Sequence, residues 1–393
     1  MRHTRSLLTA IAALAVVGVT FLGGYLAGDW RARRAAGPDA DTSLLWQVRD
    51  LLSTRFLGDM PDAQAPLFGA VRGLVGAYQD PYTIFVEPAP RRIERDEIRG
   101  HFGGIGATMG RNEGGDLVLT LMRDRPAARA GVKDGDILLA VDGKPITRQM
   151  SVQDVVGLVR GDEGTKVVLT LKRADTASPL DITVVRERIE TPSVEWRVLS
   201  EADHIGYVKI SLFGERTTQE LETGLAELSA KGVDKLALDL RGNGGGLVDT
   251  AVDVTSRFLA DGTVLYETKR DGQERYYPVK RVTSPAHKWP LVILVDAGTA
   301  SASEIVAGAL RDAQRAVLIG EKTYGKGSVQ EVHELPGGTS LHVTVARWLT
   351  PARHQIDKVG LAPDIQVNIS AADRDAGRDP QLTRAQSWLH GEK

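Results

Sequence analysis

The sequence has no cysteine among its 393 residues and no marked excess of charge of either sign. Without cysteine, disulfide bonds, thiolate metal sites and a cysteine nucleophile are excluded. The 49 Lys and Arg residues are matched by 51 Asp and Glu residues. Proteins dedicated to nucleic acids usually carry a basic excess, so nucleic acid is not expected as a partner.

Two catalytic signatures are also absent. No His-Glu-x-x-His motif occurs, which argues against a zinc protease, and no Gly-x-Ser-x-Gly motif occurs, which argues against an α/β-hydrolase. The eight histidines are scattered, and His204, His333 and His342 fall in strand-like segments where a structural role is expected. We therefore expect neither a metal nor a cofactor.

The composition is otherwise that of a folded protein, with 42% hydrophobic and 25% charged residues. The length predicts two or three domains. The 42 glycines exceed the usual share of about 7%, so several positions are expected to need dihedral angles or close approaches that glycine allows.

An uncharged apolar stretch covers residues 7–28, shortly after Arg5. As a helix it would span roughly 33 Å, which is enough to cross a bilayer. A cleaved signal peptide would have a shorter apolar core and a small-x-small site, which the following residues match poorly. The sequence favours an uncleaved membrane anchor over a cleaved signal or a buried core helix, while three arginines at 31, 33 and 34 weaken the charge asymmetry that fixes orientation.

Two amphipathic helices are predicted after a linker at residues 35–41. The first covers Ser43 to Phe56, and the second runs from about Leu67 to Tyr78. We interpret them as a small N-terminal helical subdomain whose apolar stripe belongs to a core and not to a binding groove. In the first helix the stripe consists of Leu44, Leu45, Val48, Leu51, Leu52 and Phe56.

Short strands and glycine turns follow from residue 102 to residue 188. This segment resembles a PDZ domain of the bacterial protease type, and the stretch PAARAGVKDGDILLAVDG at residues 126–143 is its most specific part. Consecutive backbone N–H groups beside an open strand edge can bind the carboxylate of a peptide C-terminus. The resemblance assigns this task to Gly103, Gly104, Ile105 and Gly106, and the alternative is that these glycines merely permit a tight turn.

Strands alternate with helices from residue 206 to about residue 369, which predicts an α/β layer with a largely parallel sheet. The ligand site of such a sheet lies off the carboxyl ends of its strands. Three loops should converge there, at residues 241–246, 297–301 and 323–327.

The last of these loops nearly spells a phosphate-binding motif, with Gly320, Gly325 and Lys326 correctly spaced. The next residue is Gly327 instead of Ser or Thr, so the hydroxyl that would bind magnesium is displaced. The segment that follows also alternates like a strand, whereas a phosphate loop opens a helix. A nucleotide-dependent enzyme is therefore a disfavoured alternative.

A serine activated by a lysine is the favoured chemistry. Ser301 lies between a predicted strand and a predicted helix, whose N-terminus favours developing negative charge. Lys326 is flanked by Gly325 and Gly327, which give it the backbone freedom to approach a neighbouring loop. The amine can accept a proton only when neutral, which requires its pKa to fall from about 10.4 toward 7, as burial can achieve.

From about Tyr78 to Ile365, the chain resembles the C-terminal processing, or tail-specific, serine proteases. The matching pieces occur in family order: DPYT, the PDZ segment, LDLRGNGGG, GTASASEIVAGAL, GEKTYGKGSVQ and ARWLTPARHQIDKVGLAPDI. The resemblance implies that Ser301 is the nucleophile, Lys326 its base and Gln330 a supporting residue. If Lys326 and Gln330 share a strand, their offset of four places them on one face, where the amide oxygen could orient the amine.

The same resemblance implies an oxyanion hole made of backbone N–H groups. One comes from Ala302, and the other from a glycine of residues 241–246, with Gly246 favoured over Gly245. Ser303 and Glu304 are expected to cap and pack the start of the helix. Arg160, at the end of the PDZ helix, is either a solvated helix-end charge or a relay between the peptide-bound PDZ domain and the protease core.

The predicted fold is an α/β protease core resembling the ClpP/crotonase-like fold, with an inserted PDZ domain (α+β, a partly open barrel) and the small helical subdomain. The predicted parts are the anchor at 1–34, the helical segment and start of the protease region at 35–100, the PDZ domain at 101–189, the Ser/Lys core at 190–370 and a C-terminal tail at 371–393.

The expected function is that of a serine endopeptidase acting near the C-terminus of exported proteins. Its expected partners are polypeptides with apolar C-termini, engaged by the PDZ domain, and the membrane, which the N-terminal segment would enter. The expected location is the periplasmic face of the bacterial inner membrane. An adaptor lipoprotein and self-association stay open, and a catalytically silent peptide-binding scaffold is the alternative from another class.

Overall fold

The computed structural model describes residues 42–392. The chain divides into two compact units, with the boundary between Gly69 and Ala70. The predicted membrane anchor at residues 7–28 lies outside the described residues. Within residues 42–392, no helix combines the length and the apolar character that a membrane crossing requires.

The two predicted N-terminal helices are confirmed as α2 (Ser43–Arg55) and α3 (Ala65–Gly76). The prediction that their apolar stripe forms a core is wrong. The six stripe residues of α2 are between 46% and 65% exposed, and neither helix buries any residue. The physical reason is size, because residues 42–69 hold only α2 and the start of α3, which is too little chain to enclose apolar side chains.

The PDZ segment forms a six-stranded sheet in the order β3-β4-β5-β7-β8, with β6 paired to β5. The predicted strands and the predicted helix, α6, are present. Ile105 and Val155 lie in its core, 2% and 0% exposed. Its elements are β3 (Ala107–Arg111), β4 (Leu117–Leu121), α5 (Pro126–Arg129), β5 (Ile137–Val141), β6 (Lys144–Pro145), α6 (Val152–Val159), β7 (Lys166–Lys172) and β8 (Leu180–Val185), beside the two-stranded sheet of β2 (His101–Gly104) and β9 (Glu187–Glu190).

A second six-stranded sheet, in the order β10-β11-β12-β15-β16-β19, holds the predicted α/β layer. All its strand pairs are parallel except β10 with β11, which confirms the largely parallel prediction. The strands are β10 (Val194–Ser200), β11 (Ile205–Ile210), β12 (Lys235–Asp239), β15 (Leu291–Val295), β16 (Val317–Gly320) and β19 (Ile365–Gln366), and the helices are α7 (Thr217–Ala230), α8 (Val248–Thr255), α9 (Ala302–Asp312), α10 (Ala371–Asp375) and α11 (Pro380–His390).

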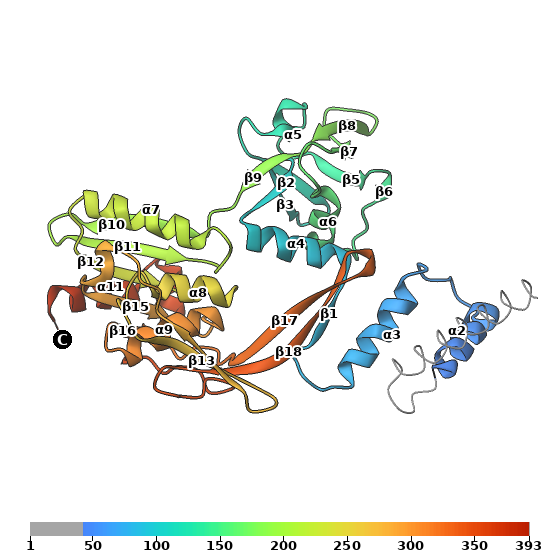
Figure 1. Cartoon of the computed structure of the whole chain (residues 1–393). Coiled ribbons are helices and arrows are strands. Elements are labelled where there is room, and N and C mark those ends of the chain that lie inside the picture. The colour runs from blue at the N-terminus through green and yellow to red at the C-terminus, as the bar shows by residue number, and fades with distance from the viewer. Residues whose placement is uncertain (1–41, 393) are drawn as a thin grey trace, which may run out of the picture. The chain divides into compact units, whose positions relative to one another are not determined.

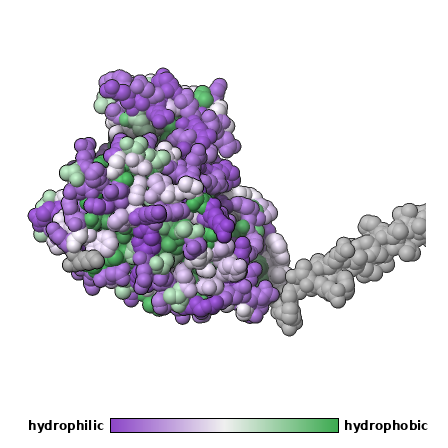
Figure 2. All heavy atoms as spheres, turned by 60° about the vertical axis from the view of Figure 1, so that its left-hand side comes forward, coloured by the Kyte–Doolittle hydropathy of each residue, from purple (hydrophilic) through white to green (hydrophobic). Residues whose placement is uncertain are grey.

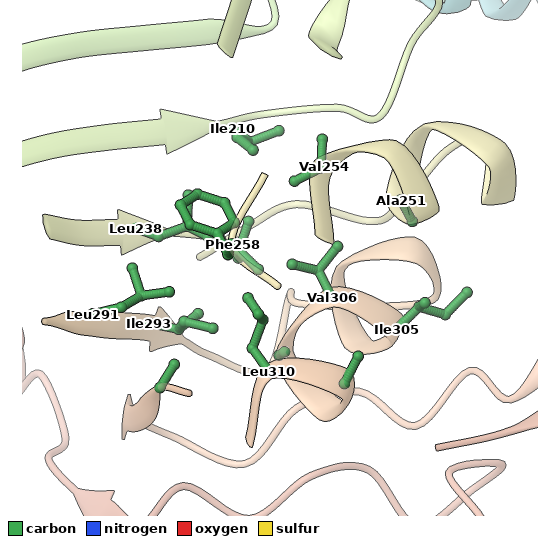
Figure 3. Packing of buried hydrophobic residues seen from close by; sticks show 14 of the residues in the cluster. Ile210, Leu238, Ala251, Val254, Phe258, Leu291, Ile293, Ile305, Val306 and Leu310 are labelled. Carbon is green, nitrogen blue, oxygen red and sulfur yellow. The ribbon is translucent and has the colours of Figure 1, made fainter. Parts of the chain in front are cut away.

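Both faces of this sheet are buried, because alternate residues of its strands enter two different clusters. On one face, Leu238 and Ile293 pack with residues of α8 and α9 (Figure 3). On the other face, Val292 and Leu294 pack with Ala385 and other residues of α11. The segment predicted as a C-terminal tail therefore includes a helix that covers the sheet. The surface of the protein in the view of Figure 2 is mostly hydrophilic, with scattered hydrophobic residues.

The remaining strands form an antiparallel sheet in the order β1-β18-β13-β14, with β17 paired to β18 (Figure 1). A phosphate-binding loop is followed by a helix. Here Lys326 is followed by the strand β17, as the sequence predicts, so the structure does not have this feature of a phosphate-binding loop. The strands are β1 (Ile84–Val86), β13 (Thr263–Lys269), β14 (Glu274–Pro278), β17 (Ser328–Leu335) and β18 (Thr339–Leu349), and α4 (Pro88–Arg99) contacts both β18 and α6.

Candidate active site

The three predicted loops converge at the carboxyl ends of β12, β15 and β16. Ala300 N donates to the carbonyl of Asn243 at 3.0 Å, which joins the first loop to the second. Tyr324 N donates to the carbonyl of Thr299 at 3.0 Å, which joins the second to the third. The predicted convergence is therefore confirmed by backbone hydrogen bonds.

Ser301 precedes the first residue of α9, as the sequence predicts, and has a φ of +55°. Such a dihedral is uncommon for a residue with a Cβ and stores strain, which is characteristic of functional sites. The Ser301 N–H donates to Glu304 Oε2 at 2.9 Å. The helix cap thus fixes the backbone of Ser301 through Glu304.

The glycines of the first loop lie against Ser301. A Cβ on Gly245 would be 2.8 Å from Ser301 Cβ and 3.0 Å from Ala302 N, and a Cβ on Gly246 would be 2.3 Å from Phe213 O. Both residues also have positive φ, +112° and +139°. These two positions therefore require glycine, because a side chain at either would collide with its neighbours.

The hydrogen bonds of the loop distinguish its candidate oxyanion donors. Gly245 N–H donates to Asn243 Oδ1 at 2.9 Å and is occupied. In residues 42–392, no hydrogen bond engages the N–H of Gly246 or that of Ala302. These two N–H groups are therefore free to donate to an oxygen, whereas that of Gly245 already donates to Asn243.

Asn243 organises this loop and was not singled out in the sequence. It is fully buried, and its Nδ2 donates to Ile210 O at 2.9 Å. Its carbonyl accepts from Ala300 N and from Ser303 Oγ at 2.9 Å. The signal that could have revealed it is a lone amide side chain within a run of glycines, where little else can hold the backbone in place.

Lys326 lies in the third loop, which packs against residues 356–360. A Cβ on Gly325 would be 2.8 Å from Gly360 N, and a Cβ on Gly327 would be 2.4 Å from Asp357 N. The Lys326 carbonyl accepts from Nε1 of Trp348, which is 1% exposed, at 3.1 Å. The flanking glycines therefore permit a close approach of backbone to backbone, as the sequence suggested.

The surroundings of the Lys326 amine act on its pKa in opposite directions. Burial lowers the pKa, and the negative charge of Glu94 in α4 raises it, with lowering as the net effect. The Nζ lies 5.2 Å from the centre of the Tyr82 ring, a contact that favours the ammonium form. The net direction is the one that a lysine base requires.

Glu304 joins the loop of Ser301, residues 297–301, to the loop of Lys326, residues 323–327, which is called the lysine loop below. Its side chain is 0% exposed and accepts from the N–H groups of Ser301 and Lys326, each at 2.9 Å. It also accepts from Gly325 N at 2.8 Å and from Thr323 Oγ1 at 2.5 Å. The capping role expected for Glu304 is present, whereas its bonds to the lysine loop have no signal in the sequence. Across the described residues, no hydrogen bond joins Ser301 Oγ to Lys326 Nζ.

The geometric argument for Gln330 was wrong. Lys326 precedes β17, which begins at Ser328, so the two residues do not share a strand. A β-bulge between Val329 and Gln330 also breaks the alternation of side chains. In this structure Gln330 Nε2 donates to Ser328 Oγ at 2.8 Å.

The predicted carboxylate loop of the PDZ domain is buried in this structure. Gly103, Gly104, Ile105 and Gly106 all have little exposed surface, and the Ile105 carbonyl accepts from Ala127 N at 2.8 Å. β3 lies at one end of the strand order, so an open strand edge follows the loop. Ile105 and Val155 both belong to the buried core of this domain.

Arg160 is not a solvated helix-end charge, so that alternative is wrong. Its guanidinium carbon lies 3.8 Å from the centre of the Phe102 ring. Its Nε and Nη1 are buried and have no hydrogen-bond partner among the described residues. Burial lowers the pKa of Arg160, while the charges of Asp96 and Glu97 raise it. The side chain lines a cavity of about 320 Å³ together with Phe102, Glu97 and residues 191–193 and 211–212.

Two family models match the chain. The model of peptidase family S41 matches residues 204–367, and the model of the PDZ domain matches residues 117–173. Among curated proteins, the chain is similar to the carboxy-terminal-processing protease of Bartonella bacilliformis, with 35% identity over 336 residues that cover 84% of this chain and 76% of that protein. It is also similar to the carboxy-terminal processing protease CtpA of Bacillus subtilis, with 33% identity over 328 residues that cover 82% and 68%.

Two solved structures are also similar. The photosystem II D1 C-terminal processing protease has 32% sequence identity and a TM-score of 0.48, with 81% of this chain and 86% of that chain covered. A candidate S41 protease of Bacteroides fragilis has 16% identity and a TM-score of 0.51, with 86% and 93% covered, and this likeness is one of fold.

Proposed function

The chain belongs to peptidase family S41, a serine-type family of carboxy-terminal processing proteases, and from this premise we propose that Ser301 is its nucleophile and Lys326 its general base. Its fold is that of an S41 peptidase with a PDZ domain. The observation that carries the proposal is the buried Glu304 carboxylate, which accepts from the backbone N–H groups of both Ser301 and Lys326. Glu304 thus holds the two backbones close together. Since no hydrogen bond joins Ser301 Oγ to Lys326 Nζ among the described residues, the proposal includes a change of side-chain rotamer that brings them together.

In the proposed reaction, Ser301 Oγ attacks the carbonyl carbon of a peptide bond while the neutral Lys326 Nζ takes the hydroxyl proton. The N–H groups of Gly246 and Ala302 stabilise the resulting oxyanion. When the C–N bond breaks, the ammonium returns the proton to the leaving amine and an ester to Ser301 remains. Water then attacks the ester while giving a proton to Lys326, and when the ester C–O bond breaks the ammonium returns that proton to Ser301 Oγ as the new C-terminus is released.

Gln330 enters the proposal on the family resemblance and not on its present contacts. Its amide, now bonded to Ser328, would orient the lysine amine after a change of rotamer. The core is proposed to have the ClpP/crotonase-like fold, with a helical subdomain within residues 35–100 and with the domain boundaries that the sequence predicts.

The PDZ domain is proposed to engage substrate tails. A peptide would add as a strand to the edge of β3, and its C-terminal carboxylate would bind N–H groups of Gly103 to Gly106. This requires the buried loop to open. Arg160, which is half-buried and lacks partners for two of its nitrogens among the described residues, would relay tail binding to the core. We also propose that the protein is exported, that its N-terminal segment anchors it in the membrane, and that its substrates are exported proteins with apolar C-termini.

The test is proteolysis of an unstructured protein by purified wild type, Ser301→Ala, Lys326→Arg and the control Ser229→Ala, whose residue is exposed on α7. Ser301→Ala should be inactive yet folded. Lys326→Arg should also be inactive, because a guanidinium stays protonated at any usable pH. The control should match wild type. Cleavage by Ser301→Ala would exclude Ser301 as the nucleophile, and activity of Lys326→Arg would exclude lysine as the base. A wild type that binds peptides but does not cleave them would favour the catalytically silent scaffold.

A further inference from the structure

A charged cluster ties the oxyanion loop, residues 241–246, to the C-terminal helix α11. Arg241 is the first residue of that loop, and its guanidinium lies between two carboxylates. Its Nη2 is 2.6 Å from Asp239 Oδ2 and 2.8 Å from Asp379 Oδ2, and its Nη1 is 2.9 Å from Asp379 Oδ1. Asp239 ends β12, whereas Asp379 immediately precedes α11. The cluster therefore joins two elements that are 138 residues apart in the sequence.

The guanidinium is held in one orientation. Arg241 Nε donates to Asp239 Oδ1 at 2.9 Å, and Nη1 also donates to Gln381 Oε1 at 3.0 Å. Tyr207 OH donates to Asp239 Oδ2 at 2.8 Å, the oxygen that also accepts from Arg241 Nη2. The side chains of Arg241 and Asp239 are 15% and 3% exposed, so water screens the bonds between these two residues little, whereas the Asp379 side chain is 34% exposed.

Asp379 serves α11 as well as Arg241. It is the N-cap residue, and its Oδ1 accepts from Leu382 N at 2.9 Å. Ala385 and Leu389 of α11, 0% and 5% exposed, pack on the face of the sheet opposite α9. Apolar packing thus holds α11 on the sheet and presents the Asp379 carboxylate at a fixed place.

The loop that follows Arg241 has few side chains of its own to hold it. Four of its next five residues are glycine, and Gly242, Gly245 and Gly246 have positive φ. A glycine chain has many conformations to lose, so its path depends on the contacts that hold it. Besides Arg241 and Asn243, these are the bond from Gly242 N to Asp296 Oδ1 and the bond from Phe213 N to the Gly245 carbonyl, each at 2.9 Å. Arg241 is the contact through which α11 can act on the loop.

We propose that Asp379 is a positioning residue for catalysis, which acts from α11 through Arg241 to fix the start of the loop that presents the Gly246 N–H to the oxyanion. This inference rests on the proposed function, since it presumes that Gly246 is an oxyanion donor. It makes the C-terminal helix a working part of the active site and assigns a role to a residue that touches neither substrate nor dyad.

Asp379→Asn separates this role from helix capping. Asparagine caps a helix as well as aspartate does, so α11 should remain folded. The variant nevertheless loses the charge and one of the two acceptors that face Arg241. Asp379→Glu keeps the charge with a longer reach. Thr383→Ala is the matched control, because Thr383 Oγ1 bonds only the Asp379 carbonyl within the same helix turn.

The experiment measures kcat and KM on a peptide substrate, the rate at which a fluorophosphonate labels Ser301, and the melting temperature of the full chain. Asp379→Asn should lower kcat and the labelling rate about tenfold or more, with KM and melting temperature near wild type. Asp379→Glu should recover part of kcat. Thr383→Ala should keep full kcat, whatever its melting temperature.

Wild-type kcat in Asp379→Asn would overturn the inference, as would a loss that follows melting temperature across all three variants. If Asp379→Asn does not fold, Arg241→Lys is the variant to measure, because one ammonium group cannot bond both carboxylates at once. Wild-type kcat in Arg241→Lys would also overturn the inference. An active Ser301→Ala would instead remove the proposed function. An inactive Ser301→Ala with a fully active Asp379→Asn would remove this inference alone.

Discussion

At the scale of single residues, the amine of Lys326 is balanced between burial and one nearby carboxylate. Burial favours the neutral form that can accept a proton from Ser301, whereas Glu94 favours the ammonium form. Glu94 is itself held by Arg91 at 3.0 Å and lies 3.4 Å from His342. Hydrogen bonds and charges from both partners lower the pKa of Glu94 against the effect of burial, so it stays ionised at neutral pH.

Glu94→Gln should therefore lower the pKa of Lys326 further. Activity requires the neutral amine, so the acid limb of the pH-rate profile should move to lower pH, by up to about one unit. The measurement is kcat/KM against pH, with Glu331→Gln as control because Glu331 is an exposed residue of β17. A shift of the limb to higher pH would contradict the assigned direction.

The glycine loop offers a matched pair of substitutions. Gly245→Ala adds a methyl group 2.8 Å from Ser301 Cβ at a φ of +112°, whereas a Cβ on Gly244 meets nothing within 4 Å. We expect Gly245→Ala to lose at least about a hundredfold in kcat, the scale of a lost oxyanion donor, and Gly244→Ala to stay close to wild type. Steady-state kinetics with circular dichroism checks this, and equal activity of the two variants would refute the close approach.

At the scale of elements, α9 contributes to both halves of the proposed dyad, because Glu304 of its first turn also holds the lysine loop. Glu304→Gln replaces one acceptor oxygen by an NH2 group that faces backbone donors. We expect the variant to lose about 2 kcal/mol or more of unfolding free energy, because buried donors are left unpaired, together with most of its kcat. Denaturant unfolding and kinetics test this.

The control lies at the other end of α9, where Asp312 Oδ2 accepts from Ala352 N at 2.9 Å. Asp312→Asn should retain kcat. If it loses as much activity as Glu304→Gln does, the effect belongs to the helix in general and not to the bridge between the loops.

Elements were predictable where the signal was local. Periodicity over a few residues predicts the strands of the parallel sheet, the PDZ helix and the start of α9. It also predicts the position of Ser301 between a strand and a helix. The contact of Gln330 could not be predicted, because a β-bulge changes the register without a sequence signature, and the bonds of Glu304 to the lysine loop could not, because these partners lie about 20 residues away. The sequence predicts a tail at residues 371–393, because the few apolar residues of α11 are interspersed with polar ones and only the sheet beneath explains them.

At the scale of the whole molecule, the proposed function assigns recognition of a substrate and its cleavage to different domains. We expect a substrate with a free C-terminus to be engaged more tightly than its amidated form, by roughly 1.5 to 3 kcal/mol, because amidation removes a charge-assisted hydrogen bond. A terminal Asp should weaken engagement comparably, because a charge would enter an apolar site. The measurement compares KM and peptide binding for free, amidated and Asp-terminated tails.

The same assay tests the proposed relay, because Arg160→Ala should lower kcat while the binding of a free tail is kept. If the intact protein does not distinguish the three tails, its PDZ domain does not read C-termini, and the Ser301 and Lys326 chemistry is unaffected by that result. Equal loss of binding and turnover in Arg160→Ala would make Arg160 a structural residue.

The hydrogen bond from Trp348 to the carbonyl of Lys326 has a practical consequence. The emission of an indole depends on the polarity and hydrogen bonding around it, and this indole is enclosed and bonded to the backbone of the proposed base. A displacement of the lysine loop on substrate binding would break that bond and alter the light that Trp348 emits. The chain has six tryptophans, so in a variant whose other five are replaced, Trp348 would serve as a fluorescent label beside the proposed active site. Movement of the loop could then be followed in real time without an attached dye.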